Sequence, residues 1–274
     1  MVPPRQGIPE DLPAELTDIP VAVLDHLLPA AEQGWRLLFD LAEEEPEHWC
    51  LLGGQMMYLL AAEAGRSLPR PTSDMDVVVD LRARTRSTEW LAGWLTKRRF
   101  ELDKSAFNRD QIGHRFVRDA DPGPGRIIFD ILAPEGLSEK ARLFTVHPFR
   151  TVQAPGTTQA LDRAELVTVA VTDMTGRAQT MGRVRRPPLW SALVCKAAAT
   201  RIVARENPER DWQDAALALS MIPSPLDLSR LYTKKDRQRL RYLTRLLDPQ
   251  NAAWRPLSSS DRELGISALE FLIG

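Results

Sequence analysis

Two aspartates one residue apart, Asp74 and Asp76, are the side chains of this sequence best placed to do chemistry. They open an apolar run, Val77-Val78-Val79, that predicts a β-strand. In a strand, residues i and i+2 point to the same face, so we expect both carboxylates to face one point. Converging carboxylates are typical of a Mg²⁺ site that substrate phosphates and water complete. The open alternative is a solvated strand end.

A double glycine, Gly53-Gly54, ends an earlier apolar run and precedes a predicted helix at 55–64. Backbone without a Cβ atom approaches a phosphate closely, and the first amides of a helix attract anions. We therefore expect Gly53, Gly54 and Gln55, which begins the helix, to bind the phosphates of a nucleotide. The alternative is a tight strand-to-helix turn with no ligand.

The segment just before the first aspartate carries Arg70, Thr72 and Ser73. The two hydroxyl groups are suited to orient the carboxylates or to contact phosphate, and the arginine is suited to bind phosphate or to fix the loop. Hydrogen bonding within a turn is an equally good interpretation of Thr72 and Ser73.

A second cluster follows in the C-terminal part of the chain. Lys196 lies among apolar residues of a predicted helix at 189–206, which indicates that its amine reaches into a cleft. Arg201 comes five residues later, and Asp211 and Asp214 follow the helix break at Asn207-Pro208. The two aspartates are three residues apart and so share a helix face. The alternative is a salt bridge between helices with no chemistry.

These residues together resemble the nucleotidyltransferase superfamily, and within it the AbiEii toxin family, which includes the MenT-type toxins of mycobacteria. The resemblance rests on Gly53-Gly54, the pattern Arg70-x-Thr72-x-Asp74-x-Asp76, Lys196 with Arg201, and Asp211 with Asp214, and it covers residues 47–220. It implies Mg²⁺-dependent transfer of a nucleotide from a nucleoside triphosphate to an acceptor hydroxyl. It also implies the tRNA 3′ end as acceptor, growth arrest as the outcome, and a cognate antitoxin protein as partner.

The resemblance also implies roles for single residues. Lys196 becomes a ligand of the triphosphate, and Asp211 positions Lys196. Arg201 is expected to bind the nucleotide as Lys196 does, or to pair with Asp211 or Asp214. A third carboxylate is expected on a neighbouring strand as metal ligand and general base, and Asp130, inside the apolar strand 126–132, is the candidate. An acid in such a strand is costly unless it is paired, so the alternative is a core acid paired with an arginine such as Arg115.

Two other functions stay open. One is a nucleotidyltransferase that modifies a small molecule or a protein, which needs a small acceptor pocket in place of a basic surface. The other is a non-catalytic relative that binds only a nucleotide or a partner, against which the intact pair Asp74 and Asp76 argues.

The charge of the chain is unevenly distributed. The net charge is −1 over 274 residues, yet the first fifty residues carry eleven acids against two arginines, so the remainder is basic. The segment 234–245, with Arg183, Arg185 and Arg186, is a candidate surface for tRNA. An ordinary solvated helix face is the alternative.

Apolar periodicity predicts the order of elements. Helices are expected at 21–44, 55–64, 85–98, 189–206, 208–221, 234–247 and 260–272, strands at 48–52 and 77–79, and hairpins at 112–132 and 165–184. Trp90, Leu91, Trp94 and Leu95 are expected to form the inner face of the helix at 85–98. The order predicts an α/β (α+β) nucleotidyltransferase-like core with a mixed sheet, followed by a C-terminal helical domain. The expected divisions are 1–46, an acidic segment and helix that packs on the core, 47–187, the nucleotidyltransferase core, and 188–274, the C-terminal helical domain.

Targeting signals are not evident in the sequence. The N-terminus lacks a signal-peptide pattern, no apolar run reaches the roughly 18 residues needed to span a membrane, and Cys50 and Cys195 both lie in apolar runs. We therefore expect a cytoplasmic protein with no membrane partner.

Overall fold

A computed structural model describes residues 22–68, 72–104, 111–175, 178–202 and 207–274 of the chain. Its main sheet has the strand order β2-β3-β6-β5-β4, with β9 paired to β6. The strands are β2 (Trp49–Leu51), β3 (Asp74–Val79), β4 (Glu101–Leu102), β5 (Arg115–Asp119), β6 (Arg126–Pro134) and β9 (Val152–Ala154). Strands β3 and β6 are parallel, whereas β2 and β5 run antiparallel to their neighbours. The sheet is therefore mixed.

Two smaller sheets accompany it. One joins β1 (Ala22–Leu24), β10 (Glu165–Thr172) and β11 (Ala178–Arg186), and the other joins β7 (Phe144–Val146) and β8 (Phe149–Arg150). Both predicted hairpins are confirmed, because β5 pairs with β6 and β10 pairs with β11.

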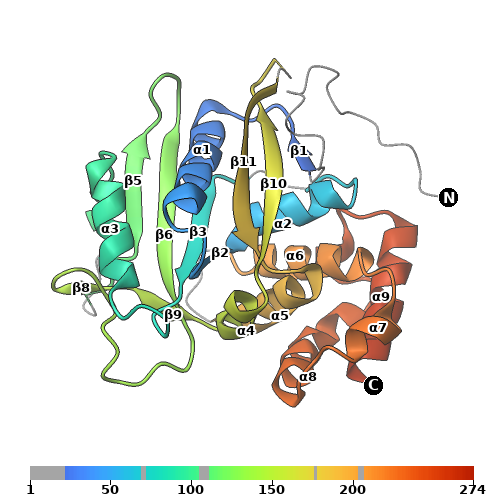
Figure 1. Cartoon of the computed structure of the whole chain (residues 1–274). Helices are drawn as coiled ribbons and strands as arrows, with labels where there is room; N and C mark the ends of the chain where they lie inside the picture. Colours follow the sequence, from blue (N-terminus) through green and yellow to red (C-terminus); the bar gives the residue numbers. More distant parts are fainter. Residues whose placement is uncertain (1–21, 69–71, 105–110, 176–177, 203–206) are drawn as a thin grey trace.

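Helices cover the sheets and then form the C-terminal part alone. Figure 1 shows α1 in front of the sheets and α3 at the outer edge of the main sheet, with the C-terminal helices gathered on the opposite side. The first group is α1 (Pro29–Glu44), α2 (Gly53–Glu63), α3 (Ser87–Lys97) and α4 (Thr157–Asp162). The second is α5 (Leu189–Ala199), α6 (Glu209–Ser220), α7 (Pro225–Ser229), α8 (Lys234–Leu240), η3 (Arg241–Leu247), η4 (Ala252–Trp254) and α9 (Ser259–Ile273). The predicted fold class, an α/β core followed by helices, is confirmed.

The central position of β3 explains its composition. It lies between β2 and β6, and Val77, Val78 and Val79 are all buried. One face is covered by α1, where Gly34 leaves room for Met75: a methyl group added at Gly34 would come within 2.2 Å of its side chain. Residues alternate between the faces of a strand, so Asp74 and Asp76 lie on the face away from α1.

Two expectations from periodicity are wrong. The region 21–44 is not one helix, because Ala22, Val23 and Leu24 form strand β1 beside β10, and α1 begins only at Pro29. Proline favours the first helical turn, and the pairing of β1 with β10 outweighs the helical spacing of its apolar residues. Trp90 is 38% exposed, although Leu91, Trp94 and Leu95 are buried as expected.

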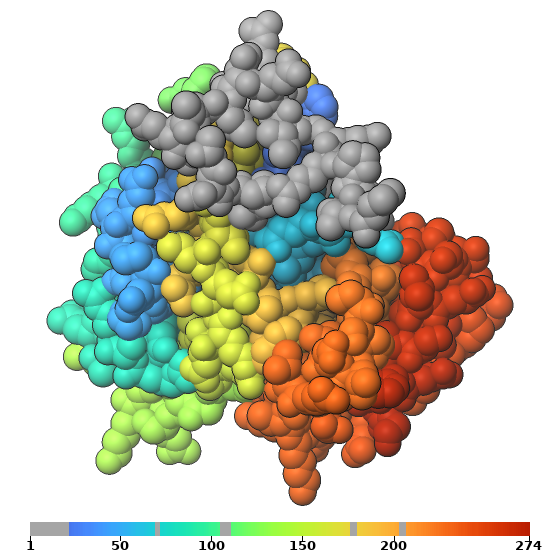
Figure 2. Space-filling model, turned by 45° about the vertical axis from the view of Figure 1, so that its right-hand side comes forward, coloured from blue at the N-terminus to red at the C-terminus, as the bar shows by residue number. Residues whose placement is uncertain are grey.

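Residues 22–46, the described part of the predicted first segment, pack on the core. Strand β1 pairs with β10, and α1 packs on β6 and β11. Figure 2 shows part of α2, in cyan, between β10 and the orange and red C-terminal helices. Divisions at residues 46 and 187 remain a prediction. In the described part of the chain, none of the helices combines the length and apolar character that crossing a bilayer requires.

Candidate active site

Three neighbouring strands bring a row of charged side chains together. Asp76 on β3 lies opposite Asp130 on β6, and Asp130 lies opposite Arg115 on β5. Residues in register on adjacent strands project from the same face of the sheet. Asp74, two residues before Asp76, joins this face. The structure therefore places three carboxylates and one guanidinium on one face of the sheet, and we call this set of Asp74, Asp76, Asp130 and Arg115 the acidic patch. Its residues come from β3 and from the hairpin of β5 and β6, which are distant in sequence.

The glycine bend lies directly against this patch. Gly53 has a positive φ of 64°, and a Cβ atom on it would lie 1.6 Å from Oδ2 of Asp76. The amide of Leu52 donates a hydrogen bond to the main-chain oxygen of Asp76 at 2.8 Å. Helix α2 begins at Gly53, and Leu52 before it offers no capping side chain. The first turn of α2 thus presents its amides beside Asp76, where an anion is favoured.

The segment before the aspartates supports them. Oγ of Ser73 donates a hydrogen bond of 2.8 Å to Oδ1 of Asp74, so Ser73 orients that carboxylate. Gln55 is 1% exposed, and its amide joins Trp35 to the main-chain oxygen of Thr72 through two bonds of 3.0 Å. The side chain of Gln55 therefore fixes the loop before the aspartates, and a contact of Gln55 with a nucleotide remains a prediction. Arg70 lies outside the described residues.

Asp130 is at the expected place but is already bonded. It is 5% exposed, and Arg115 donates to both of its carboxylate oxygens, from Nε at 2.9 Å and from Nη2 at 2.7 Å. This bidentate pair is the alternative that the sequence left open. Its hydrogen bonds raise the pKa of Arg115 above the ordinary value, so the guanidinium stays charged.

A two-carboxylate metal site fits these residues better than a three-carboxylate one. Among the described residues, no group of three or more His, Cys, Asp or Glu side chains is arranged to hold a metal ion. Asp74 and Asp76 share one face, and the carboxylate of Asp76 occupies the position that a side chain on Gly53 would take. Such a site suits Mg²⁺, which uses one or two carboxylates together with substrate phosphates and water. The role of Asp130 as a metal ligand remains a prediction that requires Arg115 to move.

Lys196 and two aspartates form a buried cluster between helices α5 and α6. Nζ of Lys196 lies 2.7 Å from Oδ2 of Asp214 and 3.3 Å from Oδ1 of Asp211, and all three residues are at most 5% exposed. Burial lowers the pKa of Lys196, but the carboxylates of Asp214 and Asp211, joined by that of Asp76, raise it above its ordinary value. The amine is therefore charged.

The same amine lies within electrostatic range of the acidic patch, because Asp76 acts on its pKa. Helix α2 packs against both α5 and α6. The helix whose first turn faces Asp76 therefore also contacts the two helices that carry the Lys196 cluster. The structure joins the two clusters that the sequence placed 120 residues apart.

Arg201 has a different contact from the ones expected. It is exposed, and its guanidinium carbon lies 5.3 Å from the ring centroid of Tyr242, a cation–π distance. Tyr242 belongs to η3, so Arg201 ties the end of α5 to the C-terminal helices. Its role in phosphate binding remains a prediction.

Two small pockets lie at the other end of β3. They measure about 190 Å³ and 170 Å³ and share His48 and Trp49 in their walls. Val79 lines the first and Asp80 the second, at the end of the strand opposite to Asp74. Neither pocket contains a residue of the acidic patch, so they form no part of the candidate site.

Arg115 belongs to the site, although the sequence suggests it only as a possible partner of Asp130. The one feature of the sequence that indicates its role is its position in the predicted hairpin at 112–132. Periodicity shows that two strands pair, but it does not give the register that sets Arg115 opposite Asp130.

Comparisons with known proteins do not identify the function of the chain. Neither models of protein families nor curated proteins match the chain. A solved structure described as a "putative nucleotidyltransferase from H. pylori" is similar at a TM-score of 0.39 with 13% sequence identity, over 89% of this chain and 93% of that one. Similarity at this level supports no conclusion about activity.

Proposed function

We propose that the protein is a nucleotidyltransferase of the AbiEii and MenT type. One observation carries the proposal: Asp74 and Asp76 share a strand face, and the backbone of Gly53 lies against the Asp76 carboxylate with no side chain between them. A carboxylate pair beside a helix start whose N-cap residue, Leu52, has no capping side chain offers binding to a cation and to phosphate at the same place.

In the proposed reaction, the oxygen of an acceptor hydroxyl attacks the α-phosphorus of a nucleoside triphosphate. The bond from that phosphorus to the oxygen bridging the α- and β-phosphates breaks, and pyrophosphate leaves. The hydroxyl proton passes to solvent, because both oxygens of Asp130 accept hydrogen bonds from Arg115. A Mg²⁺ ion on Asp74 and Asp76 would supply electrostatic stabilisation of the phosphates.

Protein groups supply the remaining steps. The first amides of α2, at Gly53 and Gly54, receive the phosphates, and Ser73 keeps the carboxylate of Asp74 in place. Lys196 adds positive charge near Asp76, and Asp211 and Asp214 fix its amine. A fixed charge is effective in such a site because it needs no reorganisation during the reaction.

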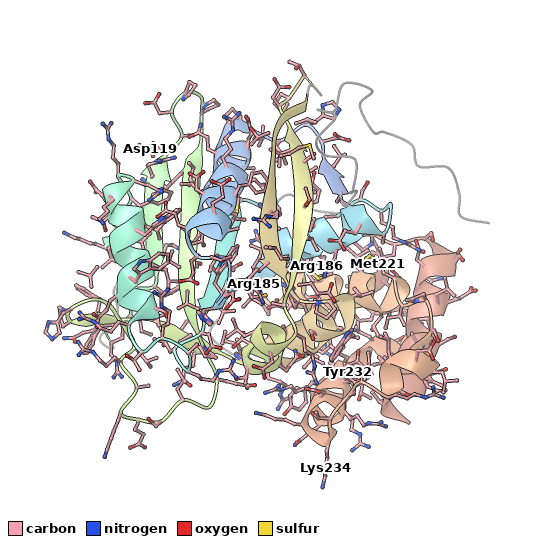
Figure 3. All side chains as sticks on the ribbon, viewed as in Figure 1. Asp119, Arg185, Arg186, Met221, Tyr232 and Lys234 are labelled. Atoms are coloured by element: carbon pink, nitrogen blue, oxygen red, sulfur yellow. The ribbon has the colours of Figure 1, made fainter. Side chains whose placement is uncertain are left out.

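The tRNA 3′ end is the proposed acceptor, and growth arrest relieved by a cognate antitoxin is the proposed biological outcome. Support comes from an exposed basic stripe on α8 and η3, formed by Lys234, Arg237, Arg241 and Arg245. These positions follow roughly helical spacing, and Lys234 lies at the outer tip of the helical part (Figure 3). Phosphate contacts from such a stripe make binding strongly dependent on salt concentration.

A specific observation favours the second candidate, transfer to a small molecule or a protein. The basic surface is smaller than the sequence indicated, because Arg186 pairs with Glu63 and Glu165, and Arg185 bonds the main-chain oxygens of Ala164 and Pro46. Figure 3 shows both arginines where β11 leads toward the helices. Both arginines make contacts within the fold, so RNA binding depends on the exposed Arg183 and on α8 and η3.

One experiment tests the proposal and separates the two acceptors. The full chain is incubated with each of the four α-labelled nucleoside triphosphates and Mg²⁺, with and without purified tRNA. Label on tRNA supports the first candidate, and label on protein or on small molecules of a cell extract supports the second. Absence of transfer with all four nucleotides and every acceptor would refute the enzymatic proposal. Asp76→Asn is the inactive control.

A further inference from the structure

Arg115 occupies a special position in the acidic patch. Its guanidinium binds both oxygens of Asp130, and Nη2 also lies 3.6 Å from Oδ2 of Asp74. It is thus one cation shared between two carboxylates, and Asp76 lies beside Asp130 on the next strand. The side chains of Arg115 and Asp74 are each 30% exposed, so this end of the pair is open to solvent.

The surroundings explain why an arginine is needed here. A carboxylate that is 5% exposed, like that of Asp130, is costly without a partner. Three carboxylates on one face repel one another, and a cation among them offsets that repulsion. A planar guanidinium satisfies the two oxygens of Asp130 at once and still reaches toward Asp74. Asp130 therefore determines where the guanidinium lies.

We propose that Arg115 is a positioning residue of the candidate metal site. Anchored on Asp130, it offsets the charge of Asp74 in the metal-free protein and keeps Asp130 out of the set of metal ligands. Asp130 then acts on the metal only through Arg115. This inference rests on the proposed function, because it concerns the same carboxylate pair.

Arg115 and Asp130 are consequently expected to affect metal binding in opposite directions. Removing the guanidinium removes a positive charge close to Asp74, so the site attracts a divalent cation more strongly. Removing the charge of Asp130 releases Arg115 toward Asp74, where it competes with the cation. Removing both leaves Asp74 and Asp76 without the competitor.

The test measures Mn²⁺ binding to the nucleotide-free full chain by electron paramagnetic resonance of the free ion. We expect Arg115→Gln to bind Mn²⁺ roughly three- to tenfold more tightly than the natural protein, and Asp130→Asn to bind it more weakly by a similar factor. The double variant is expected to recover at least the natural affinity. Arg118→Gln is the matched control, because Arg118 is on the same strand, bonds the main-chain oxygen of Arg98 and stacks on Phe100.

The double variant decides between the two roles of Asp130. If Asp130 is itself a metal ligand, the double variant stays as weak as Asp130→Asn, and the inference is wrong. Unchanged affinity in Arg115→Gln also overturns it. Asp76→Asn separates these failures from a failure of the proposed function: where the natural protein and Asp76→Asn bind Mn²⁺ equally or not at all, the metal site itself is absent.

The melting temperature is the second measurement, and it takes account of variants that lose stability. Arg115→Gln leaves a buried carboxylate unpaired, so its melting temperature without metal is expected to fall more than that of the double variant, in which both partners are neutral. If Arg115→Gln does not fold, Asp130→Asn and the double variant still decide the question. A double variant less stable than Arg115→Gln contradicts the pairing on which the proposal depends.

Discussion

The α-carbon of Gly53 lies so close to the carboxylate of Asp76 that a methyl group there would be 1.6 Å from Oδ2. The two residues belong to different elements, the first turn of α2 and the third residue of β3. This contact is what makes the glycine part of the candidate site. If Gly53 were needed only for its positive φ, no other side chain would have to lie where its Cβ atom would be.

Gly53→Ala is therefore expected to abolish nucleotide transfer, while Gly65→Ala is not. Both glycines have a positive φ, 64° and 66°, so both substitutions cost about 1–2 kcal/mol of backbone strain. Only at Gly53 does the added methyl group displace a carboxylate, since nothing lies within 4 Å at Gly65. Transfer rates and melting temperatures of the two variants check this. Equal activity in both would show that the contact with Asp76 has no role.

Asp76→Asn is expected to lower transfer by at least ~100-fold, because it removes a charged ligand from the pair. Asp80→Asn is the control, at the other end of the same strand. The carboxylate of Asp80 binds the guanidinium of Arg82 at 2.7 and 2.8 Å, and that contact is distant from Gly53. Rates of pyrophosphate release with saturating nucleotide and acceptor distinguish the variants. If the two behave alike, the carboxylate pair is not the catalytic centre.

Lys196→Met is expected to destabilise the protein as well as inactivate it. The change leaves the carboxylates of Asp211 and Asp214 buried without their ammonium partner, which costs about 3–5 kcal/mol of unfolding free energy. Lys235→Met is the comparison, because that side chain is 65% exposed and its ion pair with Glu135 contributes at most about 1 kcal/mol. Urea unfolding measures both. A loss below about 1 kcal/mol for Lys196→Met would show that other groups balance the two carboxylates.

Stability is expected to fall as the pH drops below 6.5, in part because of His114. Burial lowers the pKa of His114 below its ordinary value of 6.5, against an opposing effect of Asp130 and with a further lowering by Arg115. Between the folded and the unfolded pKa the unfolded chain binds more protons, so acid favours unfolding. Well above pH 6.5 both states are neutral at this residue and the effect disappears.

His114→Gln should reduce this dependence on pH. The difference in melting temperature between pH 7.5 and pH 5.5 is the measurement, compared in the natural protein and the variant. A difference of the same size in both would mean that other groups cause the acid sensitivity.

Local patterns in the sequence are sufficient to predict most of the elements and the kinds of residue at the site. Apolar alternation and helical spacing are local properties, so the two hairpins, the buried strand Val77–Val79 and the helical C-terminal part could be read from neighbouring residues. The spacing of Asp74 and Asp76 likewise made a shared strand face predictable. Short apolar stretches fit both the helical and the strand period, and this is why helical spacing predicts a helix over residues that form β1.

Which of these side chains contact one another depends on the tertiary structure. The register of β3, β6 and β5 sets Asp76, Asp130 and Arg115 in one row, and a shift of one residue would have turned Asp130 to the other face. The packing of α2 against α5 and α6 brings Lys196 within range of Asp76. Register and helix packing depend on contacts between residues far apart in the chain, which no local pattern records. For this reason the sequence named both Asp130 and Arg115, but only the folded chain shows that they bind each other.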